Sequence, residues 1–516
     1  MMKLGQKKPT LLDCTLRDGG YYTEWDFDGS IVDDYFETMN RLPVDFIEIG
    51  YRSKFKEEYA GAYYYLPEFV LRSIKSKTDK KLTIILNEKE VLPEDLDILL
   101  TPCQGLVTMV RLAVAPENYK RALKLAKKVK DLGFLVSFNL MYASRWDTSF
   151  KMDENLVELN IAADYFYVVD SYGGLFPEQV SVIFEKLKQY LNIPLGFHGH
   201  NNLEMALVNS LAALNSGAGI VDSTICGMGR GAGNLKTELW LSVLHQQHGI
   251  PVNFDALNAL TNSFSALKEK YKWGTNLPYM VSGAFSLPQD TVMSRINKRY
   301  YSLNAIIEEV CETGVPELSE ISFPKFGNFK MVDKVLLVGG GNSVVKFSSA
   351  LVEFLRIKPE ICIIYASSKN VPVFSELPNL QIHCLSGGEG RRLEKLIKFE
   401  GQKNRMFVVP PKNISVYNYV PDSYLENTFQ LEEINFIDTF KNSATTMAIQ
   451  IAVQCMAKEL YLTGYDGYGE GVTKDQLELF DENQFIFDYL KNDQPELAAV
   501  TPTFYAIPSK SIFSLI

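Results

Sequence analysis

Two histidines separated by a single residue are the first side chains whose spacing could do chemistry. His198 and His200 flank Gly199 at the end of an apolar run, residues 193–200, and the whole chain has only five histidines. Residues two apart on a β-strand point to the same side, so both imidazoles are expected to face one ligand. Imidazole nitrogens are common ligands of divalent metals. A surface pair without a ligand is the alternative.

Oxygen donors that could complete such a site lie in two other segments. Asp18 follows Arg17 in the motif TLRDGG, and Asn234 ends the glycine-rich motif GMGRGAGN. Taken singly, the first motif could form a salt bridge in a solvated loop, and the second could be a flexible turn. Together, one carboxylate, two imidazoles and an amide oxygen suit Mn²⁺, Mg²⁺ or Zn²⁺. The predicted metal ligands are Asp18, His198, His200 and Asn234.

A further polar motif, DSYGG, begins at Asp170 directly after an apolar run. Ser171 could form a hydrogen bond with a substrate oxygen, or it could serve only in the turn. Asp170 is expected to be structural.

These polar motifs follow four of eight short apolar runs. Helix-length amphipathic stretches such as NYKRALKLAKKVKDLG separate most of the runs. Eight strand–helix units in series predict a closed (β/α)₈ barrel, with the active site at the carboxyl ends of the strands. In a closed barrel the last strand lies beside the first, which would bring the four predicted ligands together. An open doubly wound sheet is the alternative fold. The predicted strands are residues 10–16, 45–50, 81–87, 105–114, 133–142, 164–171, 193–200 and 219–227.

The motifs TLRDGG, DSYGG, HGHNN and GMGRGAGN, in this order, resemble those of a superfamily of metal-dependent lyase and condensing barrels. The superfamily includes hydroxymethylglutaryl-CoA lyase, isopropylmalate synthase and 4-hydroxy-2-oxovalerate aldolase. The resemblance covers residues 8–300, and the last two motifs are most similar to the aldolase branch. It implies an aldolase that cleaves or forms a small 4-hydroxy-2-oxo acid through a pyruvate-type enolate, with a 2-oxo acid and an aldehyde as partners. It also allows a homodimer.

The resemblance implies roles for individual residues. Asp18, His198 and His200 would be the metal ligands. Asn234 matches an asparagine that ligates the metal in some members, and Arg17 would stabilise the enolate.

One position departs from the aldolase pattern. In the aldolases a histidine three residues after the motif aspartate is the base, and this sequence has Tyr21 there. A phenol with a pKa of about 10 is a weak base at neutral pH. Tyr21 as tyrosinate or a metal-bound hydroxide would then take the proton, or the reaction differs. Tyr279 is a further candidate, with packing as its alternative role.

The rest of the chain predicts a second, smaller α/β domain. After an extension and linker at 301–333, the sequence KVLLVGGGNS begins a strand–turn–helix–strand unit, so 334–516 is expected to be Rossmann-like. Gly339 and Gly341 lie in a turn that could hold a phosphate, although the GxGxxG pattern is incomplete.

Two later segments of this domain, KNSATTM and ELYLTGYDGYG, resemble Rossmann-like domains related to archaeal pterin pyrophosphokinase and sialyltransferase-type proteins. This implies that Ser443, Thr445 and Asp466 contact a phosphorylated or nucleotide-linked ligand. Helix capping and turn formation are the alternative roles.

Composition excludes several classes of protein. The net charge of −10 argues against a nucleic-acid-binding surface. No apolar run is long enough to span a membrane, and the amino-terminal residues lack the apolar core of a signal peptide. Seven scattered cysteines indicate reduced thiols, which favours a cytoplasmic location.

The leading hypothesis is therefore a metal-dependent aldolase with Mn²⁺ or Mg²⁺, or Zn²⁺, as its cofactor. A Claisen-type condensing enzyme that uses an acyl-CoA is the second hypothesis. The third is a bifunctional enzyme whose second domain binds a nucleotide or phospho-sugar in surface glycan synthesis.

Overall fold

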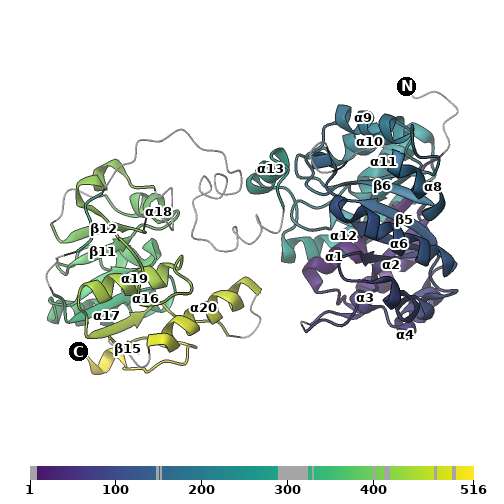
Figure 1. Cartoon of the computed structure of the whole chain (residues 1–516). Helices are drawn as coiled ribbons and strands as arrows, with labels where there is room; N and C mark the ends of the chain where they lie inside the picture. The colour runs from purple at the N-terminus through teal and green to yellow at the C-terminus, as the bar shows by residue number, and fades with distance from the viewer. Residues whose placement is uncertain are drawn as a thin grey trace. The chain divides into compact units, whose positions relative to one another are not determined.

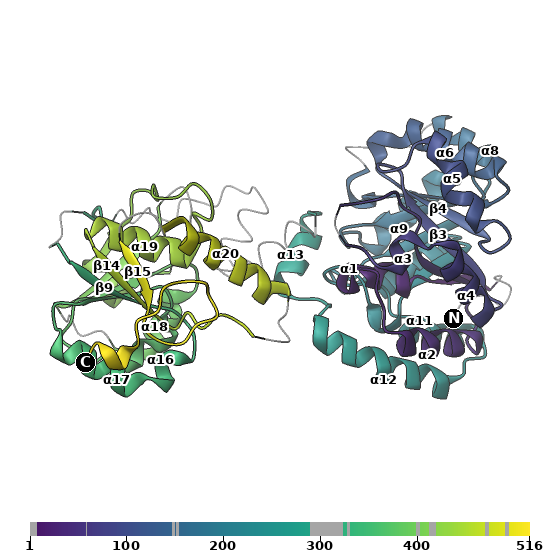
Figure 2. The ribbon, with the colours of Figure 1, turned by 90° about the horizontal axis from the view of Figure 1, so that it is seen from below.

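The structure is a computed structural model that describes residues 8–57, 59–146, 150, 154–288, 323–327, 331–398, 403–411, 419–469, 474–490 and 495–516. The chain divides into two compact units, Met1–Met293 and Ser294–Ile516. Figures 1 and 2 show the helices and strands of each unit.

Eight parallel strands form a closed barrel in the first unit. Neighbours pair in sequence order and β1 pairs with β8, so the sheet has no free edge. The predicted barrel is confirmed, and the open sheet is wrong for this unit. The strands are β1 (Thr10–Asp13), β2 (Phe46–Tyr51), β3 (Lys81–Asn87), β4 (Met109–Val114), β5 (Leu135–Leu140), β6 (Tyr165–Asp170), β7 (Leu195–Gly199) and β8 (Ile220–Ser223).

Helices cover the outside of the barrel (Figure 1). In α6 (Tyr119–Asp131) the buried residues Ala122, Ala126 and Val129 recur every three or four positions, and the lysines lie between them. The other helices of this unit are α1 (Thr15–Thr23), α2 (Gly29–Asn40), α3 (Ala62–Tyr65), α4 (Glu68–Lys77), α5 (Leu96–Leu100), α8 (Leu159–Ala162), α9 (Pro177–Leu187), α10 (Ala206–Asn215), α11 (Thr237–His248), α12 (Phe254–Tyr271) and α13 (Leu277–Ala284).

The first strand is shorter than predicted, and this places the TLRDGG motif on a helix. β1 ends at Asp13, whose carboxylate accepts the backbone N–H of Thr15 at 3.0 Å and so starts the turn into α1. Arg17 and Asp18 are buried in α1, so the solvated-loop alternative is wrong.

The segment 273–280, which contains Tyr279, is partly helical. Asn276 caps α13 by accepting the backbone N–H of Tyr279 at 3.0 Å, which places Tyr279 in the first turn of that helix.

The second unit contains a seven-stranded, all-parallel sheet with the order β13-β12-β11-β10-β9-β14-β15. The strand order reverses at β9, as in doubly wound folds. The predicted second α/β domain is therefore confirmed as a fold. The strands are β9 (Lys334–Val338), β10 (Cys362–Tyr365), β11 (Gln381–Cys384), β12 (Arg405–Val409), β13 (Thr428–Gln430), β14 (Glu459–Thr463) and β15 (Glu496–Ala499), and the helices are α16 (Ser343–Lys346), α17 (Ser348–Ile357), α18 (Glu389–Leu396), α19 (Ala444–Gln454) and α20 (Lys474–Leu490).

The predicted linker lies mostly outside the described residues. Its described part, 323–327, lies at the edge of the second sheet, where Lys325 forms a parallel bridge with Gln430 and Phe326 is buried. The six cysteines in the described ranges are free thiols. In those ranges no helix is long and apolar enough to cross a membrane.

Candidate functional site

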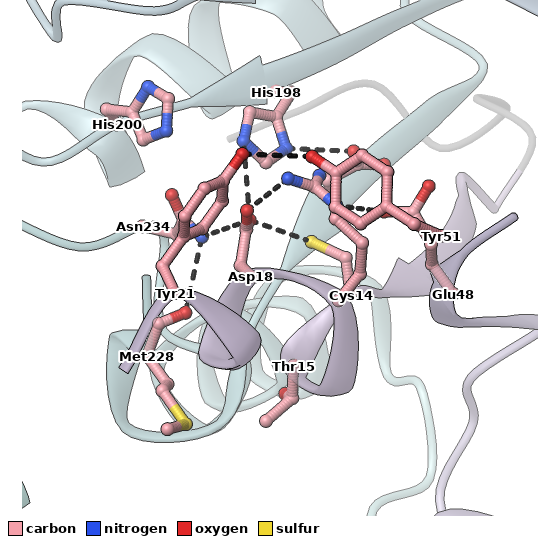
Figure 3. Close-up of polar contacts among 12 residues, drawn as sticks. Cys14, Thr15, Asp18, Tyr21, Glu48, Tyr51, His198, His200, Met228 and Asn234 are labelled. Carbon is pink, nitrogen blue, oxygen red and sulfur yellow. Dashed lines mark hydrogen bonds and ion pairs between the residues drawn. The ribbon is translucent and has the colours of Figure 1, made fainter. Parts of the chain in front are cut away.

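The carboxylate of Asp18 is the centre of a buried polar cluster at the carboxyl ends of the barrel strands (Figure 3). Its Oδ2 accepts a hydrogen bond from Nδ2 of Asn234 at 2.7 Å. The same oxygen lies 3.7 Å from Nε2 of His198 and 3.6 Å from Sγ of Cys14. The barrel thus brings together residues from the ends of β1, β7 and β8, as closure predicts.

Asp18 carries its charge although it is buried. Burial alone would raise the pKa of this carboxyl, but the guanidinium of Arg17 and the neighbouring histidines hold it below its ordinary value. Arg17 is ion-paired with Asp18 and also donates from Nε to Glu48 at 2.6 Å. The cluster therefore presents an ionised carboxylate beside a fixed cation.

His198 is oriented by a second carboxylate. Nδ1 of His198 lies 2.9 Å from Oδ2 of Asp222, and the pKa of Asp222 is held low by Arg111 and His198 despite burial. Because a carboxylate only accepts hydrogen bonds, Nδ1 must carry the hydrogen. This leaves Nε2 facing Asp18, which is the arrangement typical of metal-binding histidines.

His200 is oriented in the same way by a backbone carbonyl. Its Nδ1 donates to the carbonyl oxygen of Asp170 at 2.9 Å. Burial, followed by the neighbouring His198, lowers the pKa of His200 to about 3, so the ring is neutral at physiological pH. Its Nε2 therefore keeps a lone pair that can bind a cation.

Asn234 contributes an amide oxygen that has no partner in the described structure. Oδ1 of Asn234 is buried and forms no hydrogen bond there, whereas Nδ2 donates to Asp18 and to the carbonyl of Met228. A buried amide oxygen without a partner is costly unless a ligand satisfies it. A hard cation is such a ligand.

The glycine-rich loop before Asn234 is tightly packed. A Cβ on Gly229 would lie 2.5 Å from Nδ2 of Asn234. Gly233 has φ +77° and lies against the carbonyl of Gly227. The glycines thus let the backbone fold closely around Asn234.

The ligand atoms of Asp18, His198 and Cys14 lie within 4.8 Å of one another, so these three residues form a possible metal-binding group. The centres of the His198 and His200 rings are 5.1 Å apart. Carboxylate, imidazole and amide donors with oriented Nε2 atoms fit a divalent cation. Cys14 was not predicted as a site residue, because an isolated cysteine in an apolar run is usually a small buried side chain of the hydrophobic core.

A chain of buried charges adjoins the cluster and was not predicted from the sequence. Arg111 on β4 lies 3.2 Å from Glu48 on β2 and 2.5 Å from Asp222 on β8. It thereby links Glu48, which holds Arg17, to Asp222, which holds His198. One signal was available, since all three residues are charged positions inside apolar strands.

Ser171 and Asp170 shape the end of β6. Oγ of Ser171 accepts the backbone N–H of Tyr142 at 2.9 Å. The carboxylate of Asp170 accepts the backbone N–H groups of Gly174 and Leu175, so its expected structural role is consistent with its contacts. Burial raises the pKa of Asp170 to about 6.

The predicted tyrosines differ in exposure. Tyr21 is 36% exposed, and its hydroxyl oxygen lies 2.9 Å from that of Tyr51. Tyr279 is buried, which raises its pKa to about 12 and leaves its phenol protonated at neutral pH. Its carbonyl accepts a hydrogen bond from Asn202 at 3.0 Å.

In the second unit, Gly339 and Gly341 lie in the turn after β9, and Asp466 lies in the turn after β14. The carboxylate of Asp466 accepts the backbone N–H of Ser343 at 2.9 Å and also its hydroxyl. A Cβ on Gly341 would lie 2.5 Å from this carboxylate. The backbone N–H of Ser343, which a phosphate in this turn would use, is thus already bound to the carboxylate of Asp466.

The other two candidates of the second unit lie at the start of α19. Ser443 is the residue before its first turn. The hydroxyl of Thr445 is 2.7 Å from Oδ1 of Asn483 and 3.3 Å from the hydroxyl of Tyr465, so it takes part in internal packing.

A cavity of about 410 Å³ lies elsewhere in the first unit. It is lined by residues of α11 and α12, among them Glu238 and Lys268. None of the predicted site residues lines it.

Known proteins resemble this chain along the barrel. The HMGL-like family model matches residues 101–263. A 4-hydroxy-2-oxovalerate aldolase from Roseiflexus castenholzii is 30% identical over 48% of this chain and 74% of its own length. An oxaloacetate decarboxylase from Mycobacterium tuberculosis is 25% identical over 55% of this chain and 84% of its own length.

A solved structure also matches. The N-terminal domain of a candidate aldolase from Bacteroides vulgatus is 48% identical, with a TM-score of 0.56, and covers 58% of this chain and 99% of that chain. The motifs, the closed barrel and these relatives agree, and the chain belongs to the HMGL-like family.

Proposed function

We propose that this protein is a divalent-metal-dependent aldolase that cleaves or forms a small 4-hydroxy-2-oxo acid through a pyruvate-type enolate. One observation carries the proposal. The charged carboxylate of Asp18 lies beside the oriented Nε2 of His198 and the unpartnered Oδ1 of Asn234. The similarity to 4-hydroxy-2-oxovalerate aldolases supports the choice of substrate class.

Asp18, His198, His200 and Asn234 would hold the cation, with Cys14 next to them. A divalent cation in this place supplies Lewis-acid stabilisation of the negative charge on the keto oxygen. Arg17 is fixed by Asp18 and Glu48, so its guanidinium is placed in advance for a developing enolate oxygen. The donor set has two oxygens and two imidazole nitrogens. The oxygens would suit Mn²⁺ or Mg²⁺, and the imidazoles with the neighbouring Cys14 would suit Zn²⁺.

Decarboxylation of a 3-carboxy-2-oxo acid is a second candidate reaction, because the chain resembles an oxaloacetate decarboxylase at 25% identity. This reaction produces the same enolate but releases carbon dioxide in place of an aldehyde. In both cases residues 8–300 would form the domain that carries out the reaction. Residues 301–333 would link this domain to residues 334–516, which would serve a separate role.

The test is exchange of the pyruvate methyl protons for deuterium in D₂O, followed by NMR. We expect exchange with Mn²⁺ or Mg²⁺, none with excess chelator, and none in the His198→Ala variant. Metal content measured by mass spectrometry should fall in the same variant. Wild-type protein that binds metal but exchanges no protons would contradict the proposed enolate chemistry.

A further inference from the structure

Two tyrosine hydroxyl groups meet beside the cluster around Asp18. Tyr21 follows Asp18 by three residues on α1 and so lies on the same face of that helix. Tyr51 is the last residue of β2, at the carboxyl-end face of the barrel. Their hydroxyl oxygens are 2.9 Å apart. Figure 3 shows the two rings, with their hydroxyl groups directed toward each other, next to Asp18 and His198.

The pair connects solvent to the buried site. Tyr21 is 36% exposed, whereas Tyr51 is only 8% exposed. Burial, followed by the neighbouring Tyr21, raises the pKa of Tyr51 well above its ordinary value, so this phenol stays protonated at neutral pH. When Tyr51 donates its hydrogen to Tyr21, the hydrogen of Tyr21 is directed away from the pair.

The position of Tyr21 is fixed by its neighbours. The ring of Trp25 packs edge-on against Tyr21 at 4.9 Å and against Tyr51 at 5.6 Å. The guanidinium of Arg230 lies over the Tyr21 ring, 4.2 Å from its centre. A cation at this distance attracts the negative charge that Tyr21 would carry after losing its proton.

The histidines of the chain are placed for other tasks. His198 and His200 use Nδ1 for Asp222 and for the carbonyl of Asp170, and their Nε2 atoms are the proposed metal ligands. The other three histidines lie on α11, His245 and His248, and on β11, His383. On this assignment none of the five histidines is left for proton transfer at the site.

We propose that Tyr21 is the proton donor that converts the enolate into the released 2-oxo acid, and that Tyr51 positions Tyr21 and stabilises its phenolate. This proposal rests on the enolate chemistry proposed above. The O–H bond of Tyr21 breaks, the proton goes to C3 of the enolate, and the bonding electrons stay on the phenolate oxygen. The enolate electrons form the new C3–H bond. The phenolate accepts a hydrogen bond from Tyr51 and then takes a proton from water.

The proposal is tested with metal-loaded protein by deuterium exchange of the pyruvate methyl group, because exchange runs the same step in both directions. We expect Tyr21→Phe to slow exchange at least 100-fold and Tyr51→Phe at least 10-fold. Both losses should appear in the exchange rate at saturating pyruvate. Mn²⁺ and pyruvate binding, measured by calorimetry, should stay at wild-type values in both variants.

Tyr64→Phe is the matched control, since Tyr64 packs on Trp25 and Tyr51 but its hydroxyl donates to Glu90 at 3.2 Å. It should exchange at the wild-type rate. The proposal is overturned when wild-type protein exchanges protons and both variants match it, or when Tyr64→Phe is slowed as much as Tyr51→Phe. Absence of exchange in wild-type protein would instead reject the proposed function itself.

Discussion

The carboxylate of Asp222 acts on the candidate metal site through His198. It accepts the Nδ1 hydrogen of His198 at 2.9 Å and binds Arg111 at 2.5 Å. In the Asp222→Asn variant the amide could turn its NH₂ group toward His198 and favour the wrong tautomer. We expect metal affinity to fall by about 10- to 100-fold. Isothermal titration with Mn²⁺ checks this, with the exposed Glu37→Gln as control.

Gly229 permits a second test at the scale of a single residue. A Cβ here would meet Nδ2 of Asn234 at 2.5 Å, while the backbone of Gly229 does not adopt a positive φ. Gly229→Ala should therefore displace Asn234 without backbone strain and lower metal affinity by about 10-fold. Gly29→Ala is the control, because nothing lies within 4 Å of its Cβ position. If Gly229→Ala binds metal as tightly as Gly29→Ala, the proposed role of Asn234 as a metal ligand is contradicted.

Residue types and their order were enough to predict Asp18, His198, His200 and Asn234 as neighbours, because strand ends share one face of a barrel. The contacts of Cys14, Tyr51 and Arg111 could not be predicted in this way. They depend on which side chains cross the barrel interior, and hence on strand register and tilt. Charged residues inside apolar strands, such as Glu48, were nevertheless a visible sign of an internal ion-pair network.

At the scale of single elements, strands were predicted better than their ends. The apolar run 10–16 extends past β1, because the carboxylate of Asp13 turns the chain into a helix at Thr15. Hydrophobicity alone does not distinguish the two states over so few residues. The segment around Tyr279 is helical because Asn276 caps the first turn of α13.

Three neighbouring strands of the second sheet carry a stack of aromatic rings. His383 on β11 stacks on Tyr365 of β10 at 4.6 Å and on Phe407 of β12 at 5.4 Å. Neither ring nitrogen has a hydrogen-bond partner in the described structure. His383→Phe should keep the stack, remove these two buried polar atoms and stabilise the second unit by about 1–2 kcal/mol. Denaturant unfolding checks this, with His383→Ala expected to destabilise the protein.

The same residue gives the second unit a predictable response to acid. Burial lowers the pKa of His383 to about 3, below the ordinary 6.5. Between pH 6.5 and about 3, His383 is protonated in the unfolded chain but neutral in the folded chain. The free energy of unfolding therefore falls as the pH drops through this range. The slope is about 1.4 kcal/mol per pH unit for one proton. His383→Phe should lose this contribution, which unfolding curves at pH 7 and pH 5 would reveal.

At the scale of the whole molecule, the two units have separate apolar cores. The barrel core runs from Leu11 to Trp273, and the cores on the two sides of the second sheet lie between Phe326 and Ile512. Stability gained by one unit should therefore leave the other unchanged. We expect two calorimetric transitions, one for each unit. At a Mn²⁺ concentration of 100 times Kd, the free energy of unfolding of the barrel unit should rise by about 2.7 kcal/mol, and that of the second unit should not change.

The His198→Ala variant serves as the control for that experiment, since its metal-sensitive transition should no longer respond to Mn²⁺. His383→Phe should move only the other transition. A single transition that responds to both changes would show that the two units unfold together.

The carboxylate of Asp466 has a consequence for any ligand of the second sheet. It occupies the turn after β9 as an anion that is covalently part of the chain. A free phosphate would have to compete with a tethered competitor, whose effective concentration is fixed by the fold and cannot be diluted. Any phosphate would therefore bind this turn more weakly than it would bind the same turn without Asp466. A ligand that also offers a hydrogen-bond donor or a cation to the displaced carboxylate would not suffer this loss of affinity.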